Sequence, residues 1–345
     1  MSSTRLITKA SAFAGGSVGL AAVTMFAILR GEARMARRRV LSHAGVQDPP
    51  DGTGYWGSGV GTALTLAMIG DSSAVGRGVH DVTQTPGVLL AVALSELADR
   101  PVRLVQVAVS GSESRDLDLQ IGRVLPERPD IAVLMIGTND VTARVSPATA
   151  MAHLRRAVLT LRDAGTQVVV GTCPDLGTLR PVPQPLRRFG RRWSRQMAAA
   201  QTVAVVEAGG RSVSLGSILG PEFAVRPELF SKDEFHPSAS GYARAAAVKL
   251  PSVADALELP APTEVHTLPV EGGVRPVARA AARAATRPGT EVTAAPGRTG
   301  GRGRLFALSL RRRPARMPTS AEVSDADRTT RERPGHEQAT KEQSP

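Results

Sequence analysis

Short apolar runs alternate with longer helical patterns between residues 60 and 250, and this alternation restricts the fold more than any other feature of the sequence. The run at 131–136, which reads IAVLMI, is apolar throughout, as expected of a central strand buried on both faces of a parallel sheet. Strands that alternate with helices predict a parallel sheet covered by helices on both sides. We therefore predict one α/β domain over residues 60–255, with strands at 64–69, 102–108, 131–136, 167–172 and 211–215 and helices at 85–98, 115–124, 147–164, 188–207 and 238–249.

Polar clusters follow three of these strands and precede the last helix. The first three read GDSS at 70–73, SGS at 110–112 and GTND at 137–140, and the fourth reads DEFH at 233–236. Because the carboxyl ends of parallel strands lie at one edge of a sheet, we expect the clusters to converge there. Each cluster alone is also typical of a turn or a helix cap. The prediction of a site therefore depends on all four together.

The clusters supply the groups of an acyl-transfer site. A serine nucleophile needs an adjacent base, and the base needs a partner that orients it. We expect Ser72 to be the nucleophile, His236 the base and Asp233 the carboxylate that holds the imidazole. The oxyanion of the tetrahedral intermediate needs fixed hydrogen-bond donors. The candidates are the N–H groups of Ser72 and Gly111 and the side-chain amide of Asn139.

The order of these motifs, G-D-S, a single Gly, G-x-N-D and D-x-x-H-P, resembles that of the SGNH hydrolases, the GDSL esterase/lipase family. The resemblance covers residues 64–250. It implies a flavodoxin-like three-layer α/β/α sandwich and a serine esterase that uses the residues named above and needs neither a metal nor a cofactor. Two blocks depart from the family pattern. The first reads GDSS instead of GDSL, and the second leaves open which of Ser110, Gly111 and Ser112 donates to the oxyanion.

We therefore expect a serine esterase that hydrolyses carboxylic esters, with a short-chain acyl ester, a lipid or an O-acetyl group as its substrate. Two alternatives stay open: a carbohydrate O-deacetylase of the same fold, and a non-catalytic binding module anchored in the cell envelope. An arginine-rich segment at 180–195 also contains Trp193. This segment is either a basic surface that docks on anionic headgroups or attracts an acidic substrate, or a helix face with its arginines in solvent.

The net charge of +12 is concentrated in the two flanks of the chain. Residues 1–50 contain seven Lys/Arg and two acidic residues, and residues 261–345 contain fifteen and nine, so the domain between them is almost neutral. Nucleic-acid-binding domains gather basic residues on one surface. We therefore expect no nucleic-acid partner for the folded domain.

Residues 1–45 are predicted to be a hydrophobic anchor or signal segment with a basic flank. Residues 10–29 contain no charged side chain, and twenty residues are enough for a helix to span a bilayer. No clear A-x-A-like cleavage site precedes the arginines that follow. We expect a membrane-anchored or exported protein of the cell envelope. Because more of the flanking positive charge follows the segment, the positive-inside rule favours the alternative, the cytoplasmic face of the membrane.

Residues 261–345 are rich in Pro, Gly, Ala, Thr and Arg and contain one aromatic residue, Phe306. A segment of this composition buries too little apolar surface to offset its ordering entropy, so we predict a disordered basic tail. The single cysteine, Cys173, excludes an intramolecular disulfide and is expected to be a small buried thiol.

Overall fold

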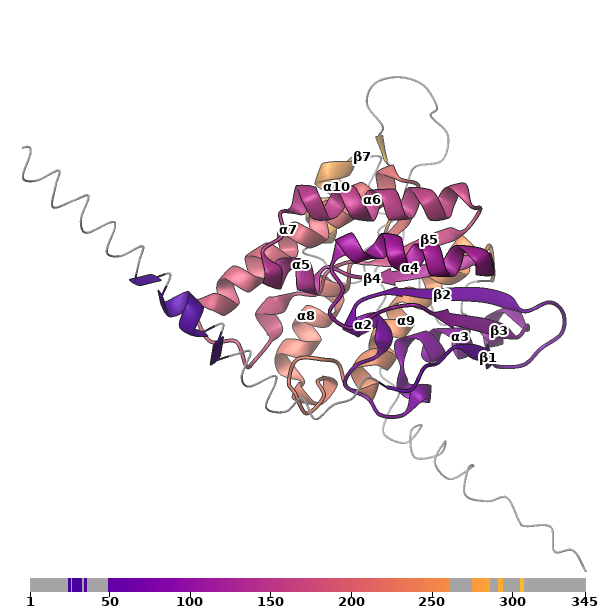
Figure 1. Cartoon of the computed structure of the whole chain (residues 1–345), viewed down its shortest axis with the longest axis horizontal. Coiled ribbons are helices and arrows are strands. Elements are labelled where there is room, and N and C mark those ends of the chain that lie inside the picture. The colour runs from indigo at the N-terminus through magenta and orange to yellow at the C-terminus, as the bar shows by residue number, and fades with distance from the viewer. Residues whose placement is uncertain are drawn as a thin grey trace, which may run out of the picture. The chain divides into compact units, whose positions relative to one another are not determined.

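The structure, a computed structural model, describes residues 24–25, 27–32, 34–35, 49–260, 275–285, 291–293 and 305–306. Within these residues the main sheet has seven strands in the order β1-β3-β2-β4-β5-β6-β8 (Figure 1), and a separate ladder pairs β7 with β9. The strands are β1 (Gly54–Trp56), β2 (Leu64–Gly70), β3 (Val102–Gln106), β4 (Ile131–Met135), β5 (Gln167–Gly171), β6 (Arg211–Val213), β7 (Arg275–Pro276), β8 (Glu291–Val292) and β9 (Leu305–Phe306).

The centre of the main sheet is parallel. The strands β3, β2, β4, β5 and β6 pair in parallel in that order, which is the flavodoxin-like 2-1-3-4-5 arrangement of a doubly wound sheet. At the two edges, β1 and β8 each add an antiparallel strand. All five predicted strands are confirmed. The strands β1 and β8 were not predicted, because two or three residues are too few for a periodic pattern.

Helices cover both faces of the sheet and complete three layers. On one face lie α3 and α9, and on the other lie α4, α6 and α7 (Figure 1). Strand residues alternate between the two cores, so that Leu66 and Met68 face the first layer while Ala67 and Ile69 face the second. The predicted α/β/α sandwich is confirmed. The helices are α2 (Ser72–Val75), α3 (Pro86–Ala98), α4 (Leu117–Val124), α5 (Thr138–Ala143), α6 (Pro147–Asp163), α7 (Leu186–Glu207), α8 (Leu215–Val225), α9 (Ala239–Ala256) and α10 (Val277–Ala284).

The flanks are described only in part. Most of the predicted anchor at 10–29 lies outside the described residues, so the anchor stays a prediction. Among the residues that the structure does describe, no helix is both long and apolar enough to cross a bilayer.

The predicted tail at 261–345 also lies mainly outside the described residues. Its described pieces include β8, which pairs with β6, and α10, whose Ala280 and Ala284 are buried in one cluster with Val206 of α7. These contacts reach the sandwich from beyond the predicted domain boundary at residue 255. Alanine carries too weak a hydropathy signal for the sequence analysis to have recognised the buried face of α10.

Candidate active site

The turn after β2 places Ser72 at the carboxyl edge of the sheet. Gly70 has a φ of +140°, and a Cβ there would lie 1.9 Å from the carbonyl oxygen of Met135 on β4, so only glycine fits. Asp71 then caps α2, because its Oδ1 accepts a hydrogen bond of 2.9 Å from the Ser73 N–H. Ser72 is therefore the first residue of α2, at the end of a strand that pairs with both β3 and β4. Doubly wound sheets of this order bind ligands at that switch point.

The Asp71 side chain is buried beneath this turn. Burial raises the pKa of its carboxyl to about 7, although hydrogen bonds from Ser73 act in the opposite direction, and the carboxylate of Asp140 adds to the increase. A carboxyl group that titrates near neutral pH therefore lies directly before the predicted nucleophile.

A tight loop before α9 brings His236 and Asp233 to Ser72. The distance from His236 Nε2 to Ser72 Oγ is 3.1 Å, and the distance from His236 Nδ1 to Asp233 Oδ2 is 2.5 Å. The loop is closed by a bond of 2.8 Å from the Ser231 N–H to the His236 carbonyl oxygen. One chain of hydrogen bonds thus joins the three predicted residues, although Ser72 and His236 are 164 positions apart in the sequence.

Asp233 is held in its charged form. Its side chain is 2% exposed, and burial alone would raise its pKa. Asp233 accepts a bond of 2.7 Å from Ser231 Oγ and bonds of 2.9 and 2.8 Å from the backbone N–H groups of Phe235 and His236. Together with the hydrogen bond and the electrostatic attraction of the His236 ring, these bonds outweigh burial. They hold the pKa of Asp233 well below its usual range. A charged carboxylate favours the tautomer with the proton on Nδ1, which leaves Nε2 to accept a proton from a hydroxyl.

Two residues that the sequence analysis missed hold the histidine loop against the serine turn. Gly78 has a φ of +109°, and a Cβ there would lie 2.6 Å from the Pro237 carbonyl oxygen and 3.0 Å from His236 Cβ. The buried Tyr242 hydroxyl donates a bond of 2.6 Å to the Arg77 carbonyl oxygen. Neither a loop glycine nor a helical tyrosine has a local signal that connects it with residues so far along the chain.

The second and third clusters meet in one hydrogen bond. Asn139, in the first turn of α5, donates from Nδ2 to the Ser112 carbonyl oxygen at 2.9 Å. The Ser112 N–H donates to the Val109 carbonyl oxygen at 3.2 Å, whereas the Gly111 N–H has no acceptor among the described residues. Gly111 has a φ of +87°, and a Cβ there would meet no atom within 4 Å. Glycine is therefore favoured at 111 by its backbone conformation and not by a close contact.

Gln120 of α4 ties the first cluster to the second, and it was not predicted. Its buried amide pairs with both backbone groups of Gly70: Oε1 accepts from the Gly70 N–H at 2.8 Å, and Nε2 donates to the Gly70 carbonyl oxygen at 2.9 Å. The same Nε2 donates to Ser112 Oγ at 3.0 Å. One side chain thus fixes the end of β2 relative to the loop after β3. A glutamine in an amphipathic helix gives no signal of this role in the sequence.

Gln201 of α7 fixes the third cluster in a similar way. Its Nε2 donates to the Ile136 carbonyl oxygen at 2.8 Å, and its Oε1 accepts from the Cys173 N–H at 2.7 Å. Gly137 has a φ of +123°, and a Cβ there would lie 2.7 Å from that Nε2. Cys173 is a buried thiol, as expected, and burial raises its pKa well above the usual range.

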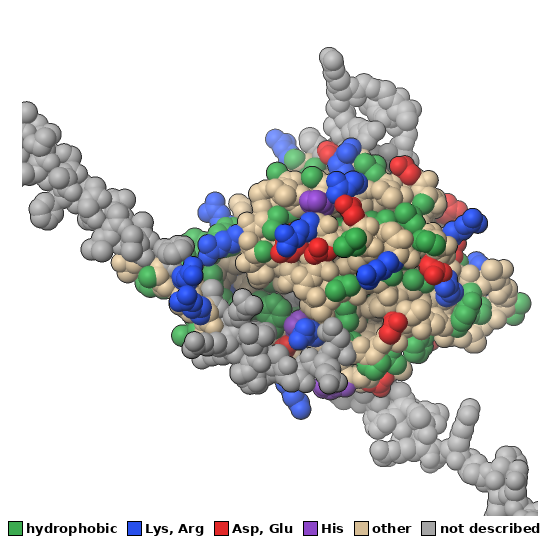
Figure 2. Space-filling view, viewed as in Figure 1, with side chains coloured by type: hydrophobic (Ala, Val, Ile, Leu, Met, Phe, Trp, Pro, Cys, Tyr) green, Lys and Arg blue, Asp and Glu red, His purple; other side chains and the backbone are tan. Residues whose placement is uncertain are grey.

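A cavity of about 60 Å³ lies beside the histidine. Figure 2 shows a hollow with hydrophobic side chains inside it, next to a histidine. Asp71 and His236 contribute to its wall on the side of the serine turn. The rings of Phe223 and Phe230 pack edge to face in the wall, with centroids 4.8 Å apart. The remaining lining is mainly apolar and includes Phe235, Leu176, Leu179 and Leu215.

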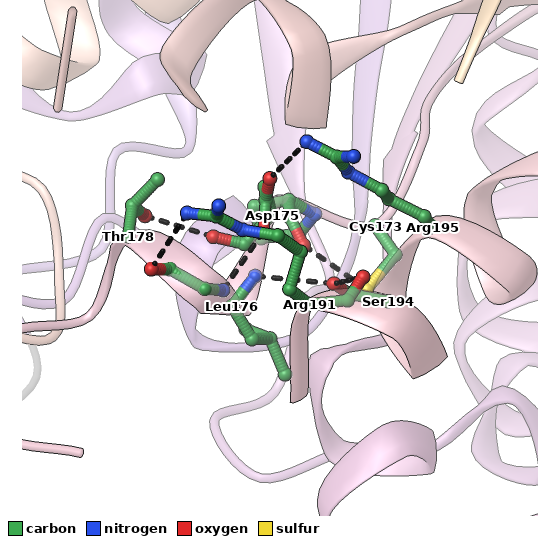
Figure 3. A network of polar contacts seen from close by, with 9 residues as sticks. Cys173, Asp175, Leu176, Thr178, Arg191, Ser194 and Arg195 are labelled. Atoms are coloured by element: carbon green, nitrogen blue, oxygen red, sulfur yellow. Dashed lines mark hydrogen bonds and ion pairs between the residues drawn. The ribbon is translucent and has the colours of Figure 1, made fainter. Parts of the chain in front are cut away.

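Asp175, which also lines this cavity, binds two arginines of α7 (Figure 3). Its Oδ2 accepts from Arg195 Nη2 at 3.1 Å, and its Oδ1 lies 3.5 Å from Arg191 Nε. Arg191 also donates to the Gly177 carbonyl oxygen at 3.1 Å. The carboxylate is buried, whereas both arginine side chains are 46% exposed. These bonds attach the arginine-rich segment to the solvent side of the cavity wall.

The family model of the GDSL-like lipase/acylhydrolases matches residues 68–244, a range that includes all four polar clusters. The GDSL-like esterase Rv1075c of Mycobacterium tuberculosis is 36% identical to this chain over 327 residues, which cover 91% of the chain and 98% of that protein. The chain belongs to the GDSL-like lipase/acylhydrolase family. This GDSL-like hydrolase is accordingly a carboxylic ester hydrolase, as predicted.

Solved structures similar to this GDSL-like hydrolase include TesA and an acetylxylan esterase. TesA is 21% identical, with a TM-score of 0.45, and the match covers 56% of this chain and 99% of TesA. A catalytic mutant of Axe2, an acetylxylan esterase from Geobacillus stearothermophilus, is 20% identical, also with a TM-score of 0.45, over 57% of this chain and 95% of Axe2.

Proposed function

We propose that this GDSL-like hydrolase cleaves esters through an acyl-enzyme formed on Ser72. The observation that carries the proposal is the unbroken hydrogen-bond chain from Ser72 Oγ through His236 to Asp233. Ser72 Oγ attacks the ester carbonyl, and its proton passes to His236 Nε2. The bond to the alcohol then breaks, and the alcohol leaves with that proton. A water molecule, deprotonated by the same Nε2, attacks the acyl-enzyme and releases the carboxylic acid and Ser72.

Three donors would stabilise the oxyanion of each tetrahedral intermediate: the N–H groups of Ser72 and Gly111 and the amide of Asn139. Within the second cluster, Gly111 is the best-supported donor, because the Ser112 N–H already donates to Val109. Asn139 uses one amide hydrogen on the Ser112 carbonyl oxygen. This bond orients the amide and leaves its second hydrogen for the oxyanion.

The cavity beside His236 is proposed to take the acyl chain, because its lining is mainly apolar. The cavity volume of about 60 Å³ is small. We therefore favour short-chain esters and O-acetylated carbohydrates as substrates over long-chain lipids.

The first experiment compares the full chain with Ser72→Ala and Ser73→Ala on p-nitrophenyl acetate. Without its nucleophile the Ser72→Ala protein should lose turnover by about 10⁴-fold or more. The Ser73→Ala protein, which lacks the neighbouring hydroxyl, should stay within about tenfold of wild type, since that hydroxyl takes no part in the proposed chemistry. A fluorophosphonate should label Ser72 alone, as located by peptide mass spectrometry. Undiminished turnover in Ser72→Ala would refute the assignment.

The pH profile of the wild-type enzyme tests for a titrating base at the site, where the Asp71 carboxyl, with a pKa of about 7, titrates in the same range. A protonated imidazole cannot accept the serine proton, so kcat/KM should fall on acidification. A flat profile between about pH 5 and 8 would contradict a histidine base, whose usual pKa lies in that range.

We also propose that residues 10–29 hold the enzyme at a membrane of the cell envelope, on the basis of twenty positions without a charge. Protease added to intact cells would digest the domain if it faces outward and would spare it if it faces the cytoplasm. Recovery of the full-length protein in the soluble fraction of lysed cells would contradict the anchor.

A further inference from the structure

The arginine-rich segment has no role in the proposed chemistry, and its charge is unusually one-sided. Residues 176–206 contain six arginines and no acidic residue. The arginines at 188, 191, 192 and 195 are exposed and lie on adjacent positions of one face of α7. No aspartate or glutamate is present in α10 either, which packs beside α7. Among the described residues, the one carboxylate that pairs with the arginines at 188, 191, 192 and 195 is that of Asp175, so positive charge is concentrated on this side of the sandwich.

These arginines line a groove of about 500 Å³ between α7 and α10, called here the arginine groove. The Asp175 carboxylate pairs with Arg191 and Arg195, and the Gly177 carbonyl oxygen accepts a bond from Arg191 (Figure 3). Part of each guanidinium is therefore fixed, while the rest is exposed. Arg188 and Arg192 have no acidic partner among the described residues. The groove therefore presents two fixed and two unpaired guanidinium groups, a set of donors that matches phosphate oxygens.

The N-terminal segment reaches the same end of α7. The Glu32 carboxylate accepts a bond of 2.8 Å from the Leu186 N–H, the first residue of the helix, and Figure 1 shows the helical residues 27–32 beside this end. Glu32 follows the charge-free stretch 10–29 by three positions. Figure 2 shows Lys/Arg side chains gathered on this side of the molecule. Residues 27–32 therefore lie beside the start of α7, close to the first of the arginines.

Aromatic side chains flank the arginines on α7. Trp193 is 37% exposed, and its ring centroid lies 6.2 Å from that of Phe189. A tryptophan beside arginines on an exposed helix face is typical of surfaces that rest at the headgroup level of a bilayer.

We propose that the arginine groove docks this hydrolase on an anionic lipid leaflet, with lipid phosphate groups in the groove and Trp193 at the interface. Each basic residue near an anionic leaflet strengthens binding about fivefold, and the attraction is screened by salt. The proposal does not depend on the catalytic assignment of Ser72.

The test uses the full chain carrying Trp56→Phe, which leaves Trp193 as its one tryptophan. The protein is reconstituted into vesicles of brominated phosphatidylcholine with or without phosphatidylglycerol, and bromine quenches a tryptophan that touches the bilayer. Trp193 should be quenched in the anionic vesicles, released by high salt and unquenched in phosphatidylcholine alone. Adding Arg188→Gln and Arg192→Gln should weaken the contact about 30-fold, since two such charges are removed, and so abolish the quenching.

A matched control removes two exposed arginines elsewhere, Arg123→Gln on α4 and Arg155→Gln on α6, and should keep the quenching. Equal quenching in both kinds of vesicle, or quenching that persists without Arg188 and Arg192, would overturn the proposal. A third result would also overturn it: Trp193 emission that changes when tripolyphosphate is added to the protein in detergent, but does not respond to phosphatidylglycerol. The groove would then bind a soluble polyanion instead of a lipid surface. Circular dichroism of each variant shows whether a loss comes from misfolding.

Discussion

The side-chain amide of Asn139 donates a hydrogen bond to the Ser112 carbonyl oxygen and, in the proposed mechanism, a second one to the oxyanion. Replacing it with alanine should lower kcat by about a hundredfold or more, as for other oxyanion donors. The value of KM should change little, because this interaction strengthens only in the transition state. Steady-state kinetics of Asn139→Ala on p-nitrophenyl acetate measure both constants.

The matched control for Asn139 is Thr142→Ala, on the same short helix. Its hydroxyl bonds only locally, to the Asn139 carbonyl oxygen at 3.1 Å, so kcat should stay near the wild-type value. If Asn139→Ala were as active as Thr142→Ala, Asn139 would have only a structural role.

At the scale of elements, Gln120 connects the ends of β2 and β3 from a third element, α4. Replacing it with alanine leaves the buried Gly70 N–H without its acceptor, which costs about 1–3 kcal/mol of stability. Because the serine turn and the Gly111 loop would then lose their mutual position, kcat should also fall, by about tenfold to a hundredfold. Kinetics and thermal unfolding of Gln120→Ala test both effects.

Val124→Ala provides the comparison for Gln120. Val124 is fully buried on the same helix but packs in the core, away from the site. Its truncation should destabilise the protein by a similar amount, about 1–2 kcal/mol, and leave kcat unchanged. A parallel fall of kcat in both variants would show that general destabilisation, and not the Gln120 amide, accounts for the loss.

The wall of the cavity belongs to several elements, and α8 contributes the buried Phe223. Truncating Phe223 to alanine should lengthen the cavity and raise the ratio of kcat/KM for octanoate over acetate esters by about tenfold or more, since each methylene that becomes buried is worth about 0.8 kcal/mol. Leu154→Ala, a core truncation on α6 in the opposite layer, should leave this ratio unchanged. An unaltered ratio in Phe223→Ala would mean that the acyl chain lies elsewhere.

At the scale of the whole molecule, several buried ionisable groups make stability depend on pH, among them Lys249 and Asp71. Lys249 of α9 is fully buried, donates to the Ala245 carbonyl oxygen at 2.8 Å, and has a pKa lowered by burial to about 7. Between pH 7 and its ordinary value of 10.5, the unfolded chain binds a proton that the folded protein does not. The free energy of unfolding therefore rises with pH across this window. The raised pKa of Asp71 works in the opposite sense, removing stability as pH rises from 3.8 to about 7.

The contribution of Lys249 can be isolated by comparing Lys249→Met with wild type in urea unfolding at several pH values. The variant should gain stability near pH 7, and its advantage should shrink toward pH 10.5, by on the order of 5 kcal/mol in all. The exposed Lys232→Met provides a control that should follow the wild-type curve. Parallel curves for Lys249→Met and wild type would show that the ammonium stays charged in the folded protein.

The elements and residues that could be predicted are those that leave a pattern in the nearby sequence. Five strands and the helices α3, α4, α6, α7 and α9 were recognised because a buried strand needs an apolar run and an amphipathic helix needs its period. The helices α2, α5 and α8 were not predicted. The candidate nucleophile, base and carboxylate were recognised because each follows a strand or precedes a helix in a fixed order. Gln120, Gly78 and Tyr242 were not recognised, because what they do depends on partners that the chain brings close only when folded.

The sequence by itself determined the α/β/α class, the family and the residues whose chemistry the site can use, since residue type and periodic burial decide these. Only the tertiary structure decided that Ser72 and His236 lie 3.1 Å apart, that the Gly111 N–H has no acceptor among the described residues while that of Ser112 is occupied, and that the cavity is small. These are distances between segments remote in sequence. They are set by how whole layers pack, and no local pattern of residues records them.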